Sequence, residues 1–321
     1  MQTETLFSIR TPTGQPLRIR RQSFYAHKGN PSKRVSFLAG LHGDELEGVA
    51  LCHRLIRYLR GLEAGEPEAF LGEVHVYPAV NPQALGAATR LWPFFGSDMN
   101  RQLGEKNGHS LPAEASRQLQ DSLQRSSDIV VDLHASNLHL KELPQIRIVE
   151  EFDRKLIPLA QHTGADLIWV HPASGIFEST FGYNLNRAKI PTLVVEAGIC
   201  LRIDDALSEQ MFDGMVHLLH HLGVLATQTG ATAAKPPHLV HSSQVHQVQA
   251  GRAGLFLCQA RLGQTVQEGD PLGTVVDPLR GEVAEAIAAP VAGLVFTLRE
   301  HPLAYEGALL VRIAQPNRSQ P

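Results

Sequence analysis

The sequence is poor in cysteine. Its 321 residues include three cysteines, Cys52, Cys200 and Cys258, which lie far apart and form no CxxC pair. This spacing excludes a disulfide framework and a zinc site built from paired thiolates. The absence of disulfide pairs is typical of a reducing compartment, and we therefore expect a cytoplasmic protein.

The sequence also lacks an excess of charge and long apolar runs. The net charge is −3 and the pI about 6.6, so the basic footprint of a nucleic-acid partner or of binding to an acidic membrane is missing. No apolar run reaches the roughly 18 residues that a membrane helix needs. The start, MQTETLFSIRTPTGQPL, has no basic segment followed by an apolar core, so we expect no signal peptide.

Strand and helix patterns alternate over the first two thirds of the chain. After a hairpin at 5–27, short apolar runs predict strands at 35–39, 73–79, 128–133, 145–149, 166–170 and 191–196. Helical spacing of apolar residues predicts helices at 44–60, 112–125, 151–163, 180–188 and 204–222. Continuous apolar strands between helices predict an α/β fold with a mixed, mostly parallel sheet flanked by helices.

The composition changes near residue 227. The segment TQTGATAAKPPH is polar and proline-bearing, and short alternating runs with turn pairs follow it. We predict a large α/β domain over 1–226, a linker over 227–239 and a small all-β, barrel-like domain over 240–316. The last domain resembles a lipoyl or biotinyl barrel. Residues 236–321 contain no lysine, which excludes a carrier role and leaves a structural or substrate-shaping one.

Three residues at predicted strand ends suggest a metal site. His42 and Glu45 lie three apart in SFLAGLHGDELEG, and His134 ends the apolar run in VVDLHAS. Two imidazoles and a carboxylate with one position left for water are typical of catalytic zinc. Asp132 is either a partner that orients a ring of this site or a cap of a helix or loop. The competing interpretation of HGDE is a helix N-terminus with a surface histidine.

Five motifs together resemble one enzyme family. GLHGDELEG, NPQAL, DMNR, DLHAS and VVEAG follow in this order, as in the succinylglutamate desuccinylase/aspartoacylase family. This family belongs with the zinc carboxypeptidases of the carboxypeptidase A type. The resemblance implies a zinc carboxypeptidase-like fold over the first domain and one Zn²⁺ per chain. It also implies that His42, Glu45 and His134 are the zinc ligands.

The resemblance assigns roles to four further residues. Glu196 in LVVEAG matches the glutamate that takes a proton from the attacking water and passes one to the leaving amine; a strand-end carboxylate is partly desolvated, which raises its pKa toward that of a general base. On the residues alone, a surface salt bridge is the competing interpretation. Asn100 and Arg101 match the pair that holds a substrate carboxylate, which a planar guanidinium grips with two hydrogen bonds. Arg90 matches the arginine that stabilises the oxyanion.

Other side chains are weaker candidates. The segment LWPFFGS between Arg90 and Asp98 is longer than in the aspartoacylase members and suggests an apolar pocket wall. Further candidates for contact with substrate are Phe177, Glu178, Phe181, His139, Lys141 and Tyr305, the last with turn packing as its alternative.

The sequence therefore predicts a zinc-dependent amidohydrolase. Its expected substrate is a small N-acyl amino acid or related carboxylate. The alternative within the enzymes is a metallocarboxypeptidase that acts on short peptides, since the same residues serve both reactions. A non-catalytic binding module is a third hypothesis, and it predicts the loss of a ligand or of the base. The sequence leaves the oligomeric state open, a homo-oligomer included.

Overall fold

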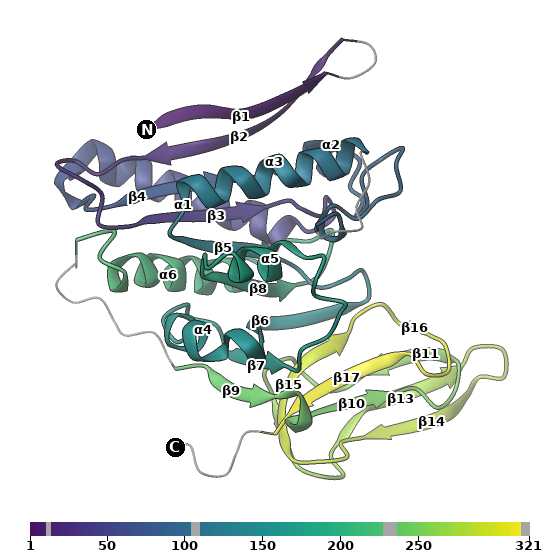
Figure 1. Ribbon diagram of the computed structural model, residues 1–321. Helices are drawn as coiled ribbons and strands as arrows, with labels where there is room; N and C mark the ends of the chain where they lie inside the picture. The colour runs from purple at the N-terminus through teal and green to yellow at the C-terminus, as the bar shows by residue number, and fades with distance from the viewer. Residues whose placement is uncertain (11–13, 104–109, 227–235, 316–321) are drawn as a thin grey trace.

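A computed structural model describes residues 1–10, 14–103, 110–226 and 236–315 (Figure 1). Its main sheet has the strand order β1-β2-β4-β3-β5-β8-β6-β15-β17-β10, with β7 beside β6 and β9 beside β7. In its first part the strands are β1 (Gln2–Arg10), β2 (Pro16–Phe24), β3 (Arg34–Ala39), β4 (Glu73–Tyr77), β5 (Ile129–His134), β6 (Leu140–Val149), β7 (Leu167–His171) and β8 (Thr192–Gly198).

The centre of the sheet is parallel. Strands β4, β3, β5 and β8 pair in parallel, while β6 runs antiparallel to β8 and β2 runs antiparallel to β4. Parallel strands need both faces covered, which explains their continuous apolar runs. Their carboxyl ends meet at one edge, so the segments after β3, β5 and β8 lie side by side.

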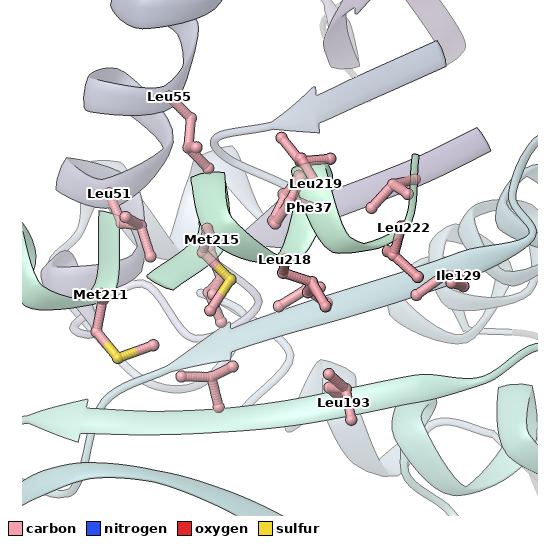
Figure 2. Close-up of a cluster of buried hydrophobic side chains, with 14 of the residues drawn as sticks. Phe37, Leu51, Leu55, Ile129, Leu193, Met211, Met215, Leu218, Leu219 and Leu222 are labelled. Carbon is pink, nitrogen blue, oxygen red and sulfur yellow. The ribbon is translucent and has the colours of Figure 1, made fainter. Parts of the chain in front are cut away.

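Helices cover both faces of the sheet. They are α1 (Leu46–Gly65), α2 (Pro82–Gly86), α3 (Leu111–Ser126), α4 (Asp153–Ala160), α5 (Phe181–Arg187) and α6 (Asp205–His221). Alternate strand residues face opposite sides: Phe37 of β3 packs with α1, α4 and α6, whereas Leu38 packs with α3 and α5. Figure 2 shows the first of these cores, where Met215 and Leu218 of α6 lie over the sheet near Leu193 of β8.

The C-terminal region is all β and joins the main sheet. Its strands are β9 (His238–His241), β10 (Val245–Gln249), β11 (Gly254–Cys258), β12 (Thr265–Val266), β13 (Pro271–Asp277), β14 (Glu282–Ala288), β15 (Gly293–Arg299), β16 (Leu303–Ala304) and β17 (Leu309–Ala314). A second sheet has the order β14-β13-β11-β16. Strand β15 pairs antiparallel with β6, and β9 pairs in parallel with β7.

The predicted fold class is confirmed: a mixed α/β sheet flanked by helices precedes an antiparallel all-β region. The predicted helices and strands exist, with ends that differ mostly by one to five residues. The start of β6 differs most in consequence, since residues 140–144 extend the predicted strand and carry its pairing with β15. Residues 227–235 of the predicted linker lie outside the described residues, and β9 begins within its last part.

Of the helices in the described part of the chain, none is both long and apolar enough to cross a membrane.

Candidate active site

The turn between β3 and α1 carries two of the predicted site residues. Gly40 has a φ of +69°, which glycine adopts without strain. Gly43 packs so closely on α2 that a Cβ atom would lie 1.9 Å from the carbonyl carbon of Ala84. The two glycines let the chain turn sharply at the carboxyl edge of the sheet, where His42 and Glu45 follow β3 directly.

His42, Glu45 and His134 converge at this edge. Glu45 Oε1 lies 2.7 Å from His42 Nδ1, and Glu45 Oε2 lies 2.9 Å from His134 Nδ1. The backbone N–H of Ala135 also donates to Glu45 Oε2, at 3.1 Å. All three side chains are buried, and one donor atom from each lies within 4.8 Å of the others. The structure thus brings together the three residues for which the sequence predicted a metal site.

A carboxylate stands behind each imidazole. Nε2 of His42 lies 3.0 Å from Asp98 Oδ1, and Nε2 of His134 lies 3.1 Å from Asp132 Oδ2, although the latter pair is not aligned for a hydrogen bond. Outer carboxylates of this kind hold the ring and make the opposite nitrogen a better ligand. Asp132 sits within β5 and caps nothing, which favours the first of its two interpretations. Sequence reasoning gave Asp98 no role, although it lies in the DMNR motif.

The charges of the site favour a cation between the donor atoms. Burial alone would raise the pKa of Glu45, but the neighbouring imidazoles of His42 and His134 lower it instead. Burial would lower the pKa of His42, yet Glu45 and Asp98 raise it. The pKa of His134 is raised in the same way by Asp132 and Glu45, against its burial. Two nitrogen donors and one carboxylate oxygen that attract positive charge fit a divalent metal ion.

Glu196 lies near the carboxyl end of β8, beside this cluster. The β5–β8 register pairs it with His134, and its Oε1 lies 3.3 Å from Arg147 Nη1. Burial raises the pKa of Glu196 to about 7; Arg147 and His134 oppose this effect, whereas Glu45 and Glu142 add to it. A carboxylate that titrates near neutral pH is suited to accept a proton in catalysis.

Asn100 and Arg101 lie in a short 3-10 turn, Met99–Arg101. The side chain of Asp98 caps its N-terminus. The side-chain Oδ1 of Asn100 accepts a hydrogen bond from the backbone N–H of Phe181, which ties the turn to α5. Arg101 Nη1 donates to the carbonyl oxygen of Asn100 at 3.1 Å. Both residues border the same cavity as the metal-site cluster.

Arg90 approaches the cluster from the segment after α2. Its Nη1 lies 3.3 Å from Glu45 Oε1 and its Nη2 lies 3.0 Å from Asp98 Oδ2, while 41% of its side chain stays exposed. The guanidinium therefore stands beside the metal-site carboxylate with one face open to the cavity.

All these residues surround one cavity of about 270 Å³. The seven predicted site residues in its wall are His42, Glu45, Arg90, Asn100, Arg101, His134 and Glu196. Phe177 and Tyr183 also line it. A concave site with a few convergent polar groups is the usual form of a small-molecule site.

Several weaker candidates lie elsewhere. Glu178 is exposed and Phe181 is buried in the core with α3 and α5; neither lines the cavity. Lys141 forms an ion pair with Asp204 at 2.7 Å, and Tyr305 is 81% exposed. The ring of His139 packs edge-to-face against that of His301.

The segment LWPFFGS does not form the expected apolar wall. Trp92 is fully buried, whereas Phe94 is fully exposed and Phe95 half-exposed. None of these three residues lines the cavity.

The sequence analysis gave no role to three charged residues that line the cavity. Glu142 and Arg147 lie on β6, and Arg312 lies on β17. The sequence signal was a charged residue inside an apolar strand pattern, as in LLVRIA. This signal could not be interpreted, because nothing in the sequence places β17 near β8.

Comparison with known proteins shows the family to which the chain belongs. A family model described as the succinylglutamate desuccinylase/aspartoacylase catalytic domain matches residues 31–222. The chain belongs to this family. The resemblance inferred from the motifs is therefore confirmed, and the family's enzymes are deacylases of N-acyl amino acids.

Relatives of this family share both sequence and fold with the chain. The N-alpha-acetyl-L-2,4-diaminobutyric acid deacetylase of Halomonas elongata is 25% identical over 253 residues, which are 76% of this chain and 71% of the relative. A succinylglutamate desuccinylase/aspartoacylase structure from Rhodobacter sphaeroides has a TM-score of 0.80 at 22% identity, covering 99% of this chain and 96% of its own. The product-bound ectoine utilization protein EutE (DoeB) of Ruegeria pomeroyi has a TM-score of 0.78 at 18% identity, covering 97% and 94%.

Proposed function

We propose that this family member is a zinc-dependent amidohydrolase that removes an acyl group from a small N-acyl amino acid or related carboxylate. The observation that carries the proposal is the convergence of His42, Glu45 and His134 on one point, next to Glu196, whose pKa is raised to about 7. The combination supplies a metal site and a proton acceptor in the same cavity.

The donor set supports zinc. Two imidazoles and one carboxylate leave a coordination position for water or substrate, as in catalytic zinc sites. When bound, zinc would act as a Lewis acid toward the carbonyl group and lower the pKa of a water molecule. His42, Glu45 and His134 would hold the ion, and Asp98 and Asp132 would orient the two rings.

The protein's own residues then have separate tasks. Glu196 accepts a proton from the attacking water and later returns a proton to the leaving amine. Arg90, whose side chain is partly open to the cavity, stabilises the negative charge that develops on the carbonyl oxygen. Asn100 and Arg101 hold the substrate carboxylate, for which the planar guanidinium offers two parallel donors.

The cavity supports a small substrate. Its volume of about 270 Å³ lies just below the range of roughly 300–1,000 Å³ that is usual for small-molecule sites. The Halomonas relative is named as a deacetylase of an N-acetylated amino acid, which supports the same substrate class here.

The decisive variant is Glu196→Gln. We expect kcat to fall by about 100-fold or more, because the amide cannot accept the proton, while zinc binding persists because Glu196 is not one of the three ligands. Turnover of N-acetyl and N-succinyl amino acids, measured together with zinc content by elemental analysis, checks both expectations. The exposed Glu268→Gln is the matched control and should retain wild-type turnover.

Four results would count against the proposal. Wild-type turnover in Glu196→Gln would show that Glu196 is not the general base. Full activity after zinc is chelated would show that the reaction does not need the metal. Hydrolysis of short peptides in preference to N-acyl amino acids would favour the metallocarboxypeptidase. A purified protein that neither holds zinc nor hydrolyses any of these compounds would instead support the binding module.

A further inference from the structure

A buried carboxylate links the C-terminal strands to the active site. Glu142 on β6 is 1% exposed and accepts three hydrogen bonds. Arg147 Nη2 donates to Glu142 Oε2 at 2.7 Å, and Arg312 Nη1 donates to Glu142 Oε1 at 2.7 Å. Thr297 Oγ1 donates to the same Oε1 at 3.2 Å. Each oxygen of this buried carboxylate therefore has a fixed partner.

The same cluster reaches the proposed general base. Arg147 Nη1 lies 3.3 Å from Glu196 Oε1, so its guanidinium bridges Glu142 and Glu196. Both guanidinium groups also lie over Trp169, with Cζ 5.6 Å from the ring centroid for Arg147 and 5.5 Å for Arg312. The aromatic ring and Glu142 together restrict the orientation of Arg147.

Two members of the cluster come from outside the catalytic-domain match. Thr297 lies on β15 and Arg312 on β17, both beyond residues 31–222. Register places them there directly, because Thr297 pairs with Glu142 across the β15–β6 contact and with Arg312 across the β15–β17 contact. In Figure 1 these C-terminal strands continue the main sheet beyond β6.

We propose that Arg312 is a positioning residue for catalysis, acting through Glu142 and Arg147 on Glu196. This inference rests on the proposed function, in which Glu196 is the base. Glu142 and Glu196 compete for one guanidinium, that of Arg147. While Arg312 and Thr297 satisfy Glu142, Arg147 can stay within reach of Glu196; without Arg312, the buried Glu142 draws Arg147 toward itself. The C-terminal β region would thus complete the active site.

The first test compares Arg312→Met with Arg299→Met. Arg299 lies on the same sheet but, among the described residues, donates to the carbonyl oxygens of Leu303 and Leu309 and not to Glu142, so its variant reports general damage to the C-terminal strands. For Arg312→Met we expect kcat to fall about 10- to 100-fold, with KM within about twofold and zinc content unchanged. Arg312→Lys should recover part of kcat, because an ammonium group can still donate to Glu142.

A double-mutant cycle tests the route. In a Glu142→Gln background, Arg312→Met should change kcat little, because the neutral amide no longer draws Arg147 away from Glu196. Independent, multiplicative effects would show that Arg312 does not act through Glu142 and would overturn the proposal. An unchanged kcat in Arg312→Met, or an equal loss in Arg299→Met, would do the same.

A crystal structure of Arg312→Met gives a readout that does not depend on activity. The proposal predicts a changed separation of Arg147 Nη1 and Glu196 Oε1, whereas an unchanged separation contradicts it. If the wild-type protein hydrolyses no N-acyl amino acid, the proposed function fails, and this separation still decides whether Arg312 positions Glu196.

Discussion

Two glutamates of the site have opposite pKa shifts because of their neighbours. Both Glu45 and Glu196 are held in the sheet's carboxyl edge, where burial raises the pKa of a carboxyl group. The imidazoles of His42 and His134 contact Glu45 directly and lower its pKa, which suits a metal ligand. For Glu196, burial outweighs the opposing charges of Arg147 and His134 and raises its pKa to about 7, which suits a base.

His75 provides a pH test at the same scale. It is buried on β4 beside Ser23, and burial together with the charge of Arg21 lowers its pKa to about 4. Between pH 6.5 and 4 the unfolded chain binds a proton that the folded protein does not, so stability falls as the pH is lowered through this range. We expect the wild type to lose up to roughly 3 kcal/mol from this group, and His75→Asn to lose less.

Urea unfolding at pH 7.5 and pH 4.5 checks this expectation. The contributions of the site histidines cancel when the free energies of unfolding of variant and wild type are subtracted. His53→Asn, on the exposed side of α1, is the control. An equal loss of stability in wild type and His75→Asn would contradict the assignment.

At the scale of elements, the turn between β3 and α1 positions His42 and Glu45, two of the three proposed metal ligands. Gly43 lies against the backbone of α2, so the turn and the short helix fit only without a side chain there. By contrast, Gly61 within α1 has nothing within 4 Å of an added Cβ atom. Two glycines at the two ends of one segment therefore have opposite roles.

We predict that alanine has opposite effects at these two positions. Gly43→Ala should cost about 2 kcal/mol or more of stability and weaken zinc binding, because the turn that carries His42 and Glu45 must shift. Gly61→Ala should gain about 0.5–1 kcal/mol, since alanine favours the helix. Thermal unfolding and zinc titration measure both effects. Equal stability of the two variants would mean that the turn adapts without cost.

The elements themselves could largely be predicted from sequence. Helical spacing located α1, α3 and α6, because their apolar stripes face the sheet. The first half of β6 escaped prediction because LKELP mixes charged residues and a proline into a strand. Those charges, Glu142 among them, are explained only by partners that lie far away in the sequence.

At the scale of the whole molecule, several strands of the C-terminal β region extend the main sheet. It covers β6 with β15 and β7 with β9. Removing it exposes two strand edges and leaves the buried Glu142 without two of its donors.

We therefore predict that a chain ended at residue 226 does not yield the native catalytic domain. It should aggregate or unfold at least about 10 °C below the full chain and show no turnover, even though residues 31–222 match the catalytic-domain family. Size-exclusion chromatography, thermal unfolding and the N-acyl amino acid assay measure this. A monomeric, active fragment would show that the C-terminal strands are dispensable.

The sequence by itself determined the alternation of strands and helices, the family, and the position of His42, Glu45, His134 and Glu196 at or near the carboxyl ends of strands. It could do so because apolar periodicity and short motifs are local, and parallel strands bring their carboxyl ends to one edge. Tertiary structure alone decided that Asp98 contacts Nε2 of His42 and that Arg312 donates a hydrogen bond to Glu142. Those contacts depend on strand register between segments far apart in the chain, which no local pattern records.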